Sequence, residues 1–211
     1  MPRKNIFITF EGIDGAGKTT QAKLLARYLQ RIGCKVLLTM EPGGEALSDM
    51  IRNIIFTSSF KICSLSELFL YEAARAQHTM DIILPALKQG SIVICDRFID
   101  STIAYQGYGC KIDLELIQKL NSIASYQLLP TITLYLDIVP VIGLDREVIK
   151  RKKIKSILQF YNNVRTGYLI QAKKHSKRIH IIKSTSLRQI QIEIRFIINK
   201  ILKYAQIKTK I

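Results

Sequence analysis

Short apolar runs alternate with amphipathic segments along most of the chain. Runs rich in β-branched residues predict buried strands, while apolar side chains that recur every three or four residues predict helices. The predicted strands are residues 6–10, 35–39, 91–95, 132–136 and 179–182. The predicted helices are residues 19–32, 46–56, 66 to about 88, 113–126 and 193–204, together with a long basic stretch before the last strand.

This alternation predicts an α/β protein built in three layers, α/β/α. Strands that alternate with helices form parallel sheets covered on both faces by right-handed crossovers. We therefore expect a five-stranded parallel sheet with ligands at the carboxyl ends of its strands. No repeat, linker or low-complexity segment divides the sequence, so residues 1–211 are predicted to form a single domain.

Composition is that of a globular protein. The 211 residues are 48% hydrophobic, which suffices for a sizeable core. No apolar run approaches the about 20 residues of a membrane span, and the chain opens on a strand rather than a signal peptide. Cys34, Cys63, Cys95 and Cys110 are widely spaced, as reduced thiols are, and the three histidines form no cluster for a metal. We therefore expect a cytoplasmic protein without a membrane segment.

A glycine-rich loop follows the first predicted strand. Residues 12–19 are Gly-Ile-Asp-Gly-Ala-Gly-Lys-Thr and satisfy the pattern G-x-x-x-x-G-K-[ST], whose glycines let backbone N–H groups surround phosphate oxygens. Lys18 is predicted to reach the β and γ phosphates, and Thr19 to hold Mg²⁺. The predicted ATP site comprises Gly12, Ile13, Asp14, Gly15, Ala16, Gly17, Lys18, Thr19 and Thr20.

Two charged residues follow the third predicted strand. Asp96 comes directly after a hydrophobic run, where a carboxylate can orient Mg²⁺ opposite Thr19. Arg97 is next to it and can offer two parallel N–H donors to a phosphate. A capping aspartate with a neighbouring salt bridge is the structural alternative, and the phosphate loop favours the functional one.

The net positive charge of the chain comes from its last third. Residues 146–211 contain 18 Lys and Arg against 2 Asp and Glu, whereas residues 1–145 contain 14 of each, so this third carries the whole net charge of +16. A basic surface for nucleic acid, a cationic cluster at residues 150–155 that meets a triphosphate, and compositional drift are all compatible with this distribution.

Five sequence blocks, in order, resemble thymidylate kinases. They are Phe-Glu-Gly-Ile-Asp-Gly-Ala-Gly-Lys-Thr-Thr-Gln at 10–21, Glu-Pro-Gly-Gly at 41–44, Ala-Ala-Arg-Ala-Gln-His at 73–78, Asp-Arg-Phe at 96–98 with Ser101, and Ala-Tyr-Gln-Gly at 104–107. The match covers residues 5–107 and extends weakly to about 170. The resemblance implies transfer of a phosphoryl group from ATP to dTMP with Mg²⁺, a phosphate-loop kinase fold and a homodimer.

The resemblance also implies roles for single residues. Asp14 would receive the sugar 3′-hydroxyl, Arg75 would hydrogen-bond the thymine edge, and Tyr71 would stack on the base. Tyr105 would crowd the 2′ position, and Arg97 would hold the acceptor phosphate. The implied dTMP-binding residues are Asp14, Pro42, Tyr71, Arg75, Arg97, Ser101, Tyr105 and Gln106. The implied catalytic residues are Asp14, Lys18, Arg97 and Arg151.

Departures from the family pattern concentrate around the ATP phosphates. Met40 and Glu45 flank the Glu-Pro-Gly-Gly block where the family commonly has Arg and Thr, and Ala16 offers no cation within the phosphate loop. We therefore expect a lid at about residues 146–155 to supply the positive charge. Arg151 is the expected catalytic cation and Arg146 a further ATP ligand.

Two other function classes stay open at this level. Another phosphate-loop kinase of nucleosides or nucleotides would share the Asp-Arg pair, although the blocks at 73–78 and 104–107 argue against it. A phosphate-loop protein without turnover, which binds nucleotide or nucleic acid through its basic third, would explain the altered lid. Nucleic acid is the less favoured partner, since runs of charge are mostly solvated surfaces.

Overall fold

The computed structural model describes residues 5–145, 154–183 and 186–207. Its centre is a five-stranded sheet in the order β2-β3-β1-β4-β5, and every pair of neighbouring strands is parallel. The strands are β1 (Phe7–Glu11), β2 (Val36–Met40), β3 (Ile92–Asp96), β4 (Ile132–Leu136) and β5 (Ile179–Ile182). The predicted five-stranded parallel sheet is thus confirmed, with boundaries that move by a single residue in the first three strands.

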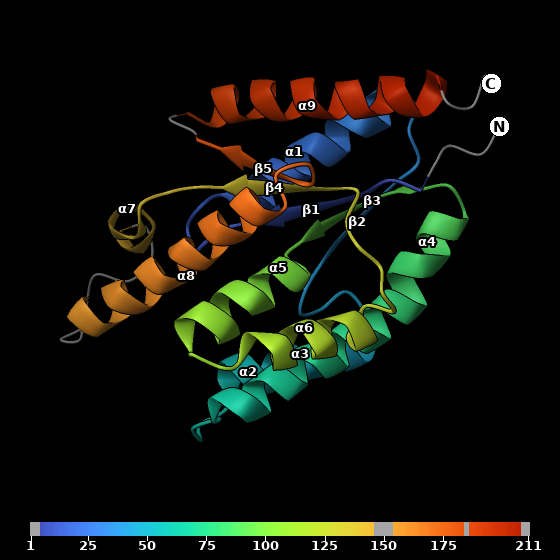
Figure 1. Cartoon of the computed structure of the whole chain (residues 1–211). Coiled ribbons are helices and arrows are strands. Elements are labelled where there is room, and N and C mark those ends of the chain that lie inside the picture. Colours follow the sequence, from blue (N-terminus) through green and yellow to red (C-terminus); the bar gives the residue numbers. More distant parts are fainter. Residues whose placement is uncertain (1–4, 146–153, 184–185, 208–211) are drawn as a thin grey trace.

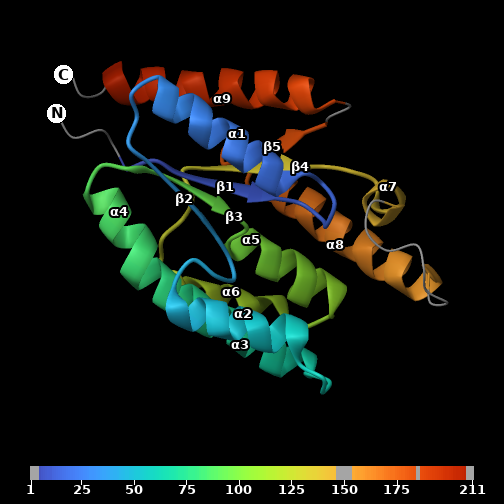
Figure 2. The same cartoon turned by 180° about the vertical axis from the view of Figure 1, so that it is seen from behind.

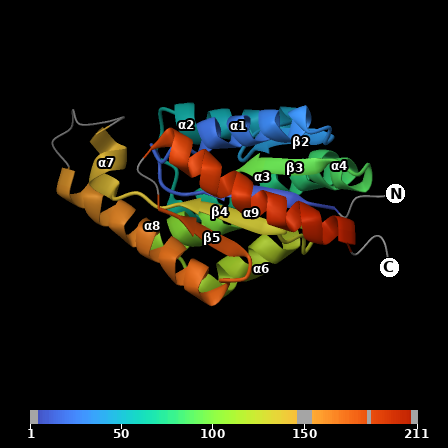
Figure 3. The ribbon, with the colours of Figure 1, turned by 90° about the horizontal axis from the view of Figure 1, so that it is seen from above.

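Helices cover both faces of the sheet, which gives the three predicted layers (Figure 1). On one face lie α1 (Lys18–Arg31) and α9 (Leu187–Ile207), and Figure 3 looks onto this layer from above. The other face carries α3 (Ser64–His78), α4 (Leu84–Lys88), α5 (Ile99–Thr102), α6 (Leu114–Ala124) and α8 (Ile154–Lys174), as seen from behind in Figure 2. Helix α2 (Ala46–Thr57) packs against α3, and α7 (Pro140–Asp145) precedes α8.

Alternation along β1 divides the core in two. Ile8 and Phe10 face the cluster under α1 and α9, with Leu25 and Ile194, whereas Phe7 faces the opposite cluster. Successive strand residues point to opposite faces, and a sheet buried on both sides therefore needs apolar residues at nearly every position. This explains why the strands appear in the sequence as continuous apolar runs.

The single long helix predicted from residue 66 to about 88 is wrong in detail. Helix α3 ends at His78, a π-helical turn η1 spans Thr79–Ile83, and α4 begins at Leu84. Pro85 lies in the first turn of α4 and has no N–H to donate to the turn before it, so the wider π turn accommodates the interruption.

Two helical segments, α7 and the segment at residues 99–109, have no counterpart among the predicted elements. Helix α5 and the π-helical η2 (Ile103–Gly109) follow directly on the Asp96-Arg97-Phe98 turn. Most of their residues are buried against α6 and α8, so the segment lacks the polar stripe that identifies a surface helix. This segment carries Ser101, Tyr105 and Gln106 into the interior, beneath the carboxyl edge of the sheet.

The strand order places two of the predicted motifs side by side. The chain leaves β1 toward β2 and leaves β3 toward β4, so the two connections run in opposite directions over opposite faces of the sheet. Phe10 pairs with Asp96, and the Arg97 N–H donates to the Phe10 carbonyl at 2.9 Å. The phosphate loop and the Asp96-Arg97 turn therefore meet at the topological switch point, the usual ligand site of such sheets.

Candidate active site

The phosphate loop joins β1 directly to α1. Gly17, at φ 84°, lies immediately before the first helical residue, Lys18, in a left-handed conformation that glycine adopts without strain. A Cβ on Gly15 would lie 2.6 Å from the carbonyl oxygen of Gly143 in α7. The loop is therefore held between the start of α1 and the helix that leads to the predicted lid.

A cleft of about 500 Å³ lies over this loop. Lys18 is almost fully buried, and its Nζ donates to the Ile13 carbonyl at 2.9 Å. Burial first, and then the nearby Arg97, lower the pKa of Lys18 to about 8. Among the predicted ATP residues, Asp14, Gly15, Gly17, Lys18, Thr19 and Thr20 line the cleft. The Ile13 and Ala16 side chains instead pack in the core, so only their backbone can serve a phosphate.

Thr19 and Asp96, the predicted magnesium residues, come together from α1 and β3. The Thr19 hydroxyl donates to Asp96 Oδ2 at 2.5 Å. The other carboxylate oxygen, Oδ1, is buried and has no hydrogen-bond partner among the described residues. A hydroxyl next to an under-used carboxylate matches the oxygen ligands that Mg²⁺ prefers, so these residues fit the ion.

A second cleft, of about 400 Å³, adjoins the first. All eight residues implied for dTMP line it: Asp14, Pro42, Tyr71, Arg75, Arg97, Ser101, Tyr105 and Gln106. They come from four separate stretches of the chain, at residues 14, 42, 71–75 and 97–106, and the fold alone brings these together. Burial raises the pKa of Tyr71 to about 12, so its ring keeps a neutral hydroxyl.

Arg97 is the hydrogen-bonding hub of this second cleft. Its Nη1 donates to the Gly12 carbonyl at 3.0 Å and to Ser101 Oγ at 3.2 Å, and its Nη2 donates to Asp14 Oδ1 at 2.5 Å. Nη2 also reaches the hydroxyl of Tyr105. The residue has φ 76°, a strained left-handed backbone for a side chain of this size. The turn after β3 therefore holds the guanidinium against the phosphate loop.

Asp14 keeps its charge in this setting. Burial opposes ionisation, but Arg97 and Lys18 together hold the pKa of the Asp14 carboxyl below its usual value. Its Oδ2 also accepts from the Tyr161 hydroxyl of α8 at 2.8 Å. An ionised carboxylate at the boundary of the two clefts is suited to receive a hydroxyl.

Arg75 lies at the floor of the second cleft. Its Nε donates to Glu41 Oε2 at 2.8 Å, and its Nη1 contacts Glu72, Thr102 and Asn121 at 2.6 to 2.9 Å. Burial opposes its charge, yet the two carboxylates raise the pKa of Arg75 above its usual value. The guanidinium is thus permanently charged and locked in orientation.

Several lining residues escaped prediction. Arg52 and Phe56 of α2, Thr102 of α5 and Glu41 all line the second cleft. Arg52 also lines the first, with its Nη1 bound to the Pro42 carbonyl at 2.8 Å. Glu41 stood in a recognised block without an assigned role, whereas Arg52, in an amphipathic helix, carried no signal that distinguishes it from a surface arginine.

The structure shows where the two residues that flank the Glu-Pro-Gly-Gly block, Met40 and Glu45, lie. Met40 lines the first cleft, where it offers no charge. Glu45 caps α2 by accepting from the N–H groups of Leu47 and Ser48. Arg52 lines both clefts and places a cation beside Met40 in the first of them. The predicted lid residues Arg146 and Arg151 lie outside the described residues, and Lys155 is exposed in the first turn of α8.

Two adjoining clefts, one over a phosphate loop and one walled by arginines, on a parallel sheet of this order are those of a phosphate-loop nucleotide kinase. The family model for thymidylate kinase matches residues 10–194, and the chain belongs to that family.

Individual relatives agree with this assignment. The chain is 48% identical over 179 residues to the thymidylate kinase of Wolbachia pipientis wMel, and the alignment covers 84% of this chain and 90% of that protein. It is 45% identical over 203 residues to the Ehrlichia chaffeensis enzyme, with 95% and 99% covered. A crystal structure of thymidylate kinase from Ehrlichia chaffeensis superimposes with a TM-score of 0.78 at 44% identity, over 92% of this chain and 98% of that one.

Proposed function

We infer that the protein transfers the γ-phosphoryl group of ATP to dTMP and forms dTDP, the step that supplies dTTP synthesis. The observation that carries this inference is that the two clefts share four residues, Asp14, Glu41, Arg52 and Arg97. A donor phosphate over the loop and an acceptor phosphate in the second cleft would meet at this shared wall. Family membership supports the same reaction and gives no support to a different kinase or a protein without turnover.

The donor side follows from the phosphate loop. Backbone N–H groups of residues 12–20 would surround the phosphates, and Lys18 would neutralise the β and γ groups. Thr19 and Asp96 would hold Mg²⁺, which supplies charge neutralisation at the transferred phosphoryl group. A lid at about residues 146–155 would close over the ATP phosphates, with Arg151 as the catalytic cation and Arg146 as a further ATP ligand. Residues 1–211, including this lid, would form a single domain.

The acceptor side follows from the second cleft. Arg97, together with Arg52, would hold the acceptor phosphate, and Asp14 would receive the sugar 3′-hydroxyl. Arg75 would meet the thymine edge, with Thr102 and Gln106 beside it and Tyr71 on the base. Tyr105 would exclude a 2′-hydroxyl. Phosphoryl transfer requires alignment and charge neutralisation rather than covalent chemistry, and these residues offer both.

We also propose a homodimer formed through the outer layer of α2, α3 and α6. Helix α3 packs between the other two, and large apolar side chains of all three are exposed. They are Leu47, Met50, Ile54, Leu65, Phe69, Leu116 and Ile123. Large apolar side chains exposed on neighbouring helices are typical of an interface. The double substitution Met50→Glu and Phe69→Glu should convert a dimer in sedimentation velocity into a monomer, whereas a monomeric wild type contradicts the proposal.

We propose that the protein is cytoplasmic, and both its cysteines and its helices agree with this location. Cys34, Cys63, Cys95 and Cys110, which all lie within the described residues, form no disulfide with one another. Within the described ranges, no helix combines the length and apolarity that a bilayer crossing needs. We propose nucleotides, rather than nucleic acid, as the partners.

A coupled assay for ADP tests the reaction itself. With ATP and Mg²⁺, the purified chain should turn over dTMP in strong preference to dUMP, dCMP, dGMP and thymidine. Preference for thymidine would indicate a nucleoside kinase. No turnover with any acceptor would indicate a binding protein and would overturn the proposal.

A further inference from the structure

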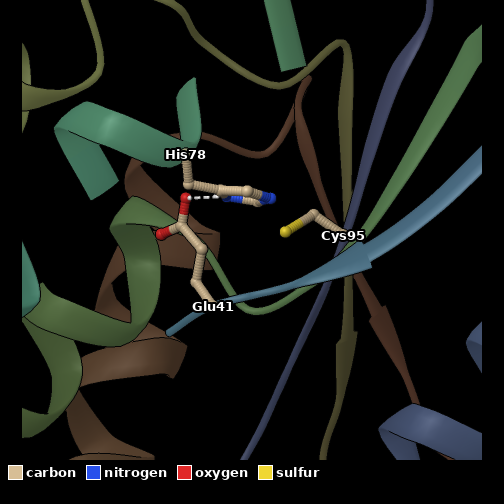
Figure 4. Close-up of side chains that lie close together, drawn as sticks. All are labelled: Glu41, His78 and Cys95. Carbon is tan, nitrogen blue, oxygen red and sulfur yellow. Dashed lines mark hydrogen bonds and ion pairs between the residues drawn. The ribbon is translucent and has the colours of Figure 1, made fainter. Parts of the chain in front are cut away.

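A buried histidine, His78, lies beneath the acceptor cleft at the end of α3. It has no exposed surface, and both ring nitrogens are engaged. Nε2 lies 2.7 Å from the Thr39 hydroxyl of β2, and Nδ1 lies 3.1 Å from Glu41 Oε1. Figure 4 shows the imidazole facing the Glu41 carboxylate, with Cys95 alongside. Because a carboxylate only accepts, Nδ1 is the nitrogen that donates to Glu41.

Glu41, His78 and Cys95 could in principle hold a metal, since one ligand atom of each lies within 4.8 Å of the others. Their hydrogen bonds favour a different role. The Cys95 thiol donates to the Arg97 carbonyl at 3.0 Å, and burial raises the pKa of Cys95 well above its usual value, so the thiol keeps its proton. The second oxygen of Glu41 is already bound to Arg75. The cluster is therefore a hydrogen-bonded network.

This network ends in the acceptor cleft. His78 donates to Oε1 of Glu41, and Oε2 of the same carboxylate accepts from Arg75 Nε at 2.8 Å. Arg75 and Glu41 both line the cleft, whereas His78 and Thr39 are absent from its lining residues. Of the two hydrogen-bond partners that the ring has among the described residues, Thr39 and Glu41, only Glu41 lines the cleft.

The loop at 41–44 closes directly on the imidazole. A Cβ on Gly44 would lie 2.5 Å from the Thr39 hydroxyl oxygen and 2.9 Å from His78 Nε2. Gly44 also has φ 93°, a conformation that favours glycine. The loop that carries Glu41 therefore packs tightly against the His78 ring, with no room for a side chain at Gly44.

We propose that His78 is a positioning residue for recognition of the acceptor base. It fixes the Glu41 carboxylate, and Glu41 in turn fixes the direction in which Arg75 presents its guanidinium to the base edge. This inference rests on the proposed role of Arg75. Recognition by a fixed polar group discriminates strongly, because a mismatched base leaves that buried group unpaired.

Two amide substitutions separate the two contacts of the ring. The amide of His78→Asn reaches the Nδ1 position and keeps a donor for Glu41, while the amide of His78→Gln reaches the Nε2 position and keeps only the contact with Thr39. We expect His78→Gln to raise the KM for dTMP about tenfold, with kcat and the KM for ATP within about twofold. The ratio of dTMP to dCMP affinity, titrated with the full chain, should fall about tenfold, and His78→Asn should stay within about threefold of wild type.

A merely structural role for His78 would lower the Tm of both variants and leave the affinity ratio unchanged. If the ratio of dTMP to dCMP affinity in folded His78→Gln stays within about twofold of wild type, His78 does not position Arg75 through Glu41, and this relay from His78 through Glu41 to Arg75 is overturned. Should neither variant fold, Glu41→Gln tests the same relay, and an unchanged ratio there overturns it equally. Arg75→Lys is measured alongside: an unchanged ratio in that variant means that the proposed role of Arg75 is wrong, whereas a change in Arg75→Lys alone overturns only the relay.

Discussion

The hydroxyl of Tyr161 donates to Oδ2 of Asp14 at 2.8 Å and so connects α8, the helix that follows the predicted lid, to the phosphate loop. Burial and the adjacent Asp14 raise the pKa of Tyr161 above its usual value, so the hydroxyl keeps its proton. Asp14 also holds Arg97 at 2.5 Å. One carboxylate therefore links the lid helix, the phosphate loop and the turn after β3.

Tyr161→Phe should lower kcat/KM for dTMP about tenfold, because Oδ2 of Asp14 loses the nearer of its two hydroxyl donors and keeps only Tyr105 at 3.4 Å. The KM for ATP should change little, since the loop backbone is untouched. Steady-state kinetics with each substrate varied in turn measure both effects. Tyr28→Phe is a matched control, since it removes a hydroxyl bound to Asn199 between α1 and α9, away from the clefts. Equal losses in the two variants would assign the effect to stability alone.

Arg52→Met should raise the KM for dTMP and lower kcat, with a combined loss of about 100-fold in kcat/KM, because a cation at the shared wall of the clefts disappears. Arg52→Lys should recover part of the loss as a point charge. Arg27→Met, on the exposed side of α1, serves as the control. Wild-type kinetics in Arg52→Met would mean that Arg52 has no role in binding or catalysis. It would then not replace the arginine that the family commonly has at the position of Met40.

The lid provides a third prediction. If Arg151 neutralises charge on the transferred phosphoryl group, Arg151→Ala should lower kcat about 100-fold while the affinity for dTMP stays within about twofold. Arg146→Ala should mainly raise the KM for ATP. Alanine substitution of each of Lys150, Lys152 and Lys153 completes the series. A kcat within about threefold of wild type in every member means that the cation comes from elsewhere.

Glu11 predicts a dependence of stability on pH. It is fully buried and accepts from the Phe98 N–H at 2.8 Å, the Ser101 hydroxyl at 2.5 Å and the Tyr168 hydroxyl at 3.0 Å. Burial, and then Asp100, raise the pKa of Glu11 to about 7, while Arg97 opposes the shift. The folded state therefore holds this proton more tightly than the unfolded chain, whose glutamate has a pKa near 4.3.

The stability due to this protonation is complete below about pH 4.3 and is lost as the pH rises through 7. Relative to Glu11→Gln, which cannot ionise, the wild type should lose on the order of 2 to 3 kcal/mol of unfolding free energy between pH 4.5 and 8. Urea unfolding of both proteins across this range measures the difference. A constant difference would show that Glu11 is already ionised at the low end.

Local sequence determined the five strands, most of the helices and the phosphate loop. The loop lies within eight consecutive residues between a strand and a helix, and its chemistry depends on backbone N–H groups and on glycines that need no distant partner. The five strands were equally visible, since a sheet covered on both faces requires unbroken apolar runs. The helix at 99–109 was not, because burial on most sides erases its polar stripe.

Tertiary structure decided which side chains meet. Arg52 stands 45 residues from Arg97, and Tyr161 stands 147 residues from Asp14, so no spacing rule joins them. For Arg75, the family resemblance implied a role in binding the base. It did not reveal that the carboxylates of Glu41 and Glu72 hold the guanidinium in place. The strand order β2-β3-β1-β4-β5 brings the ends of β1 and β3 together, and from that contact the shared wall of the two clefts follows. Sequence patterns record each residue's burial and backbone, whereas a site made from separate segments exists only once packing has fixed their distances.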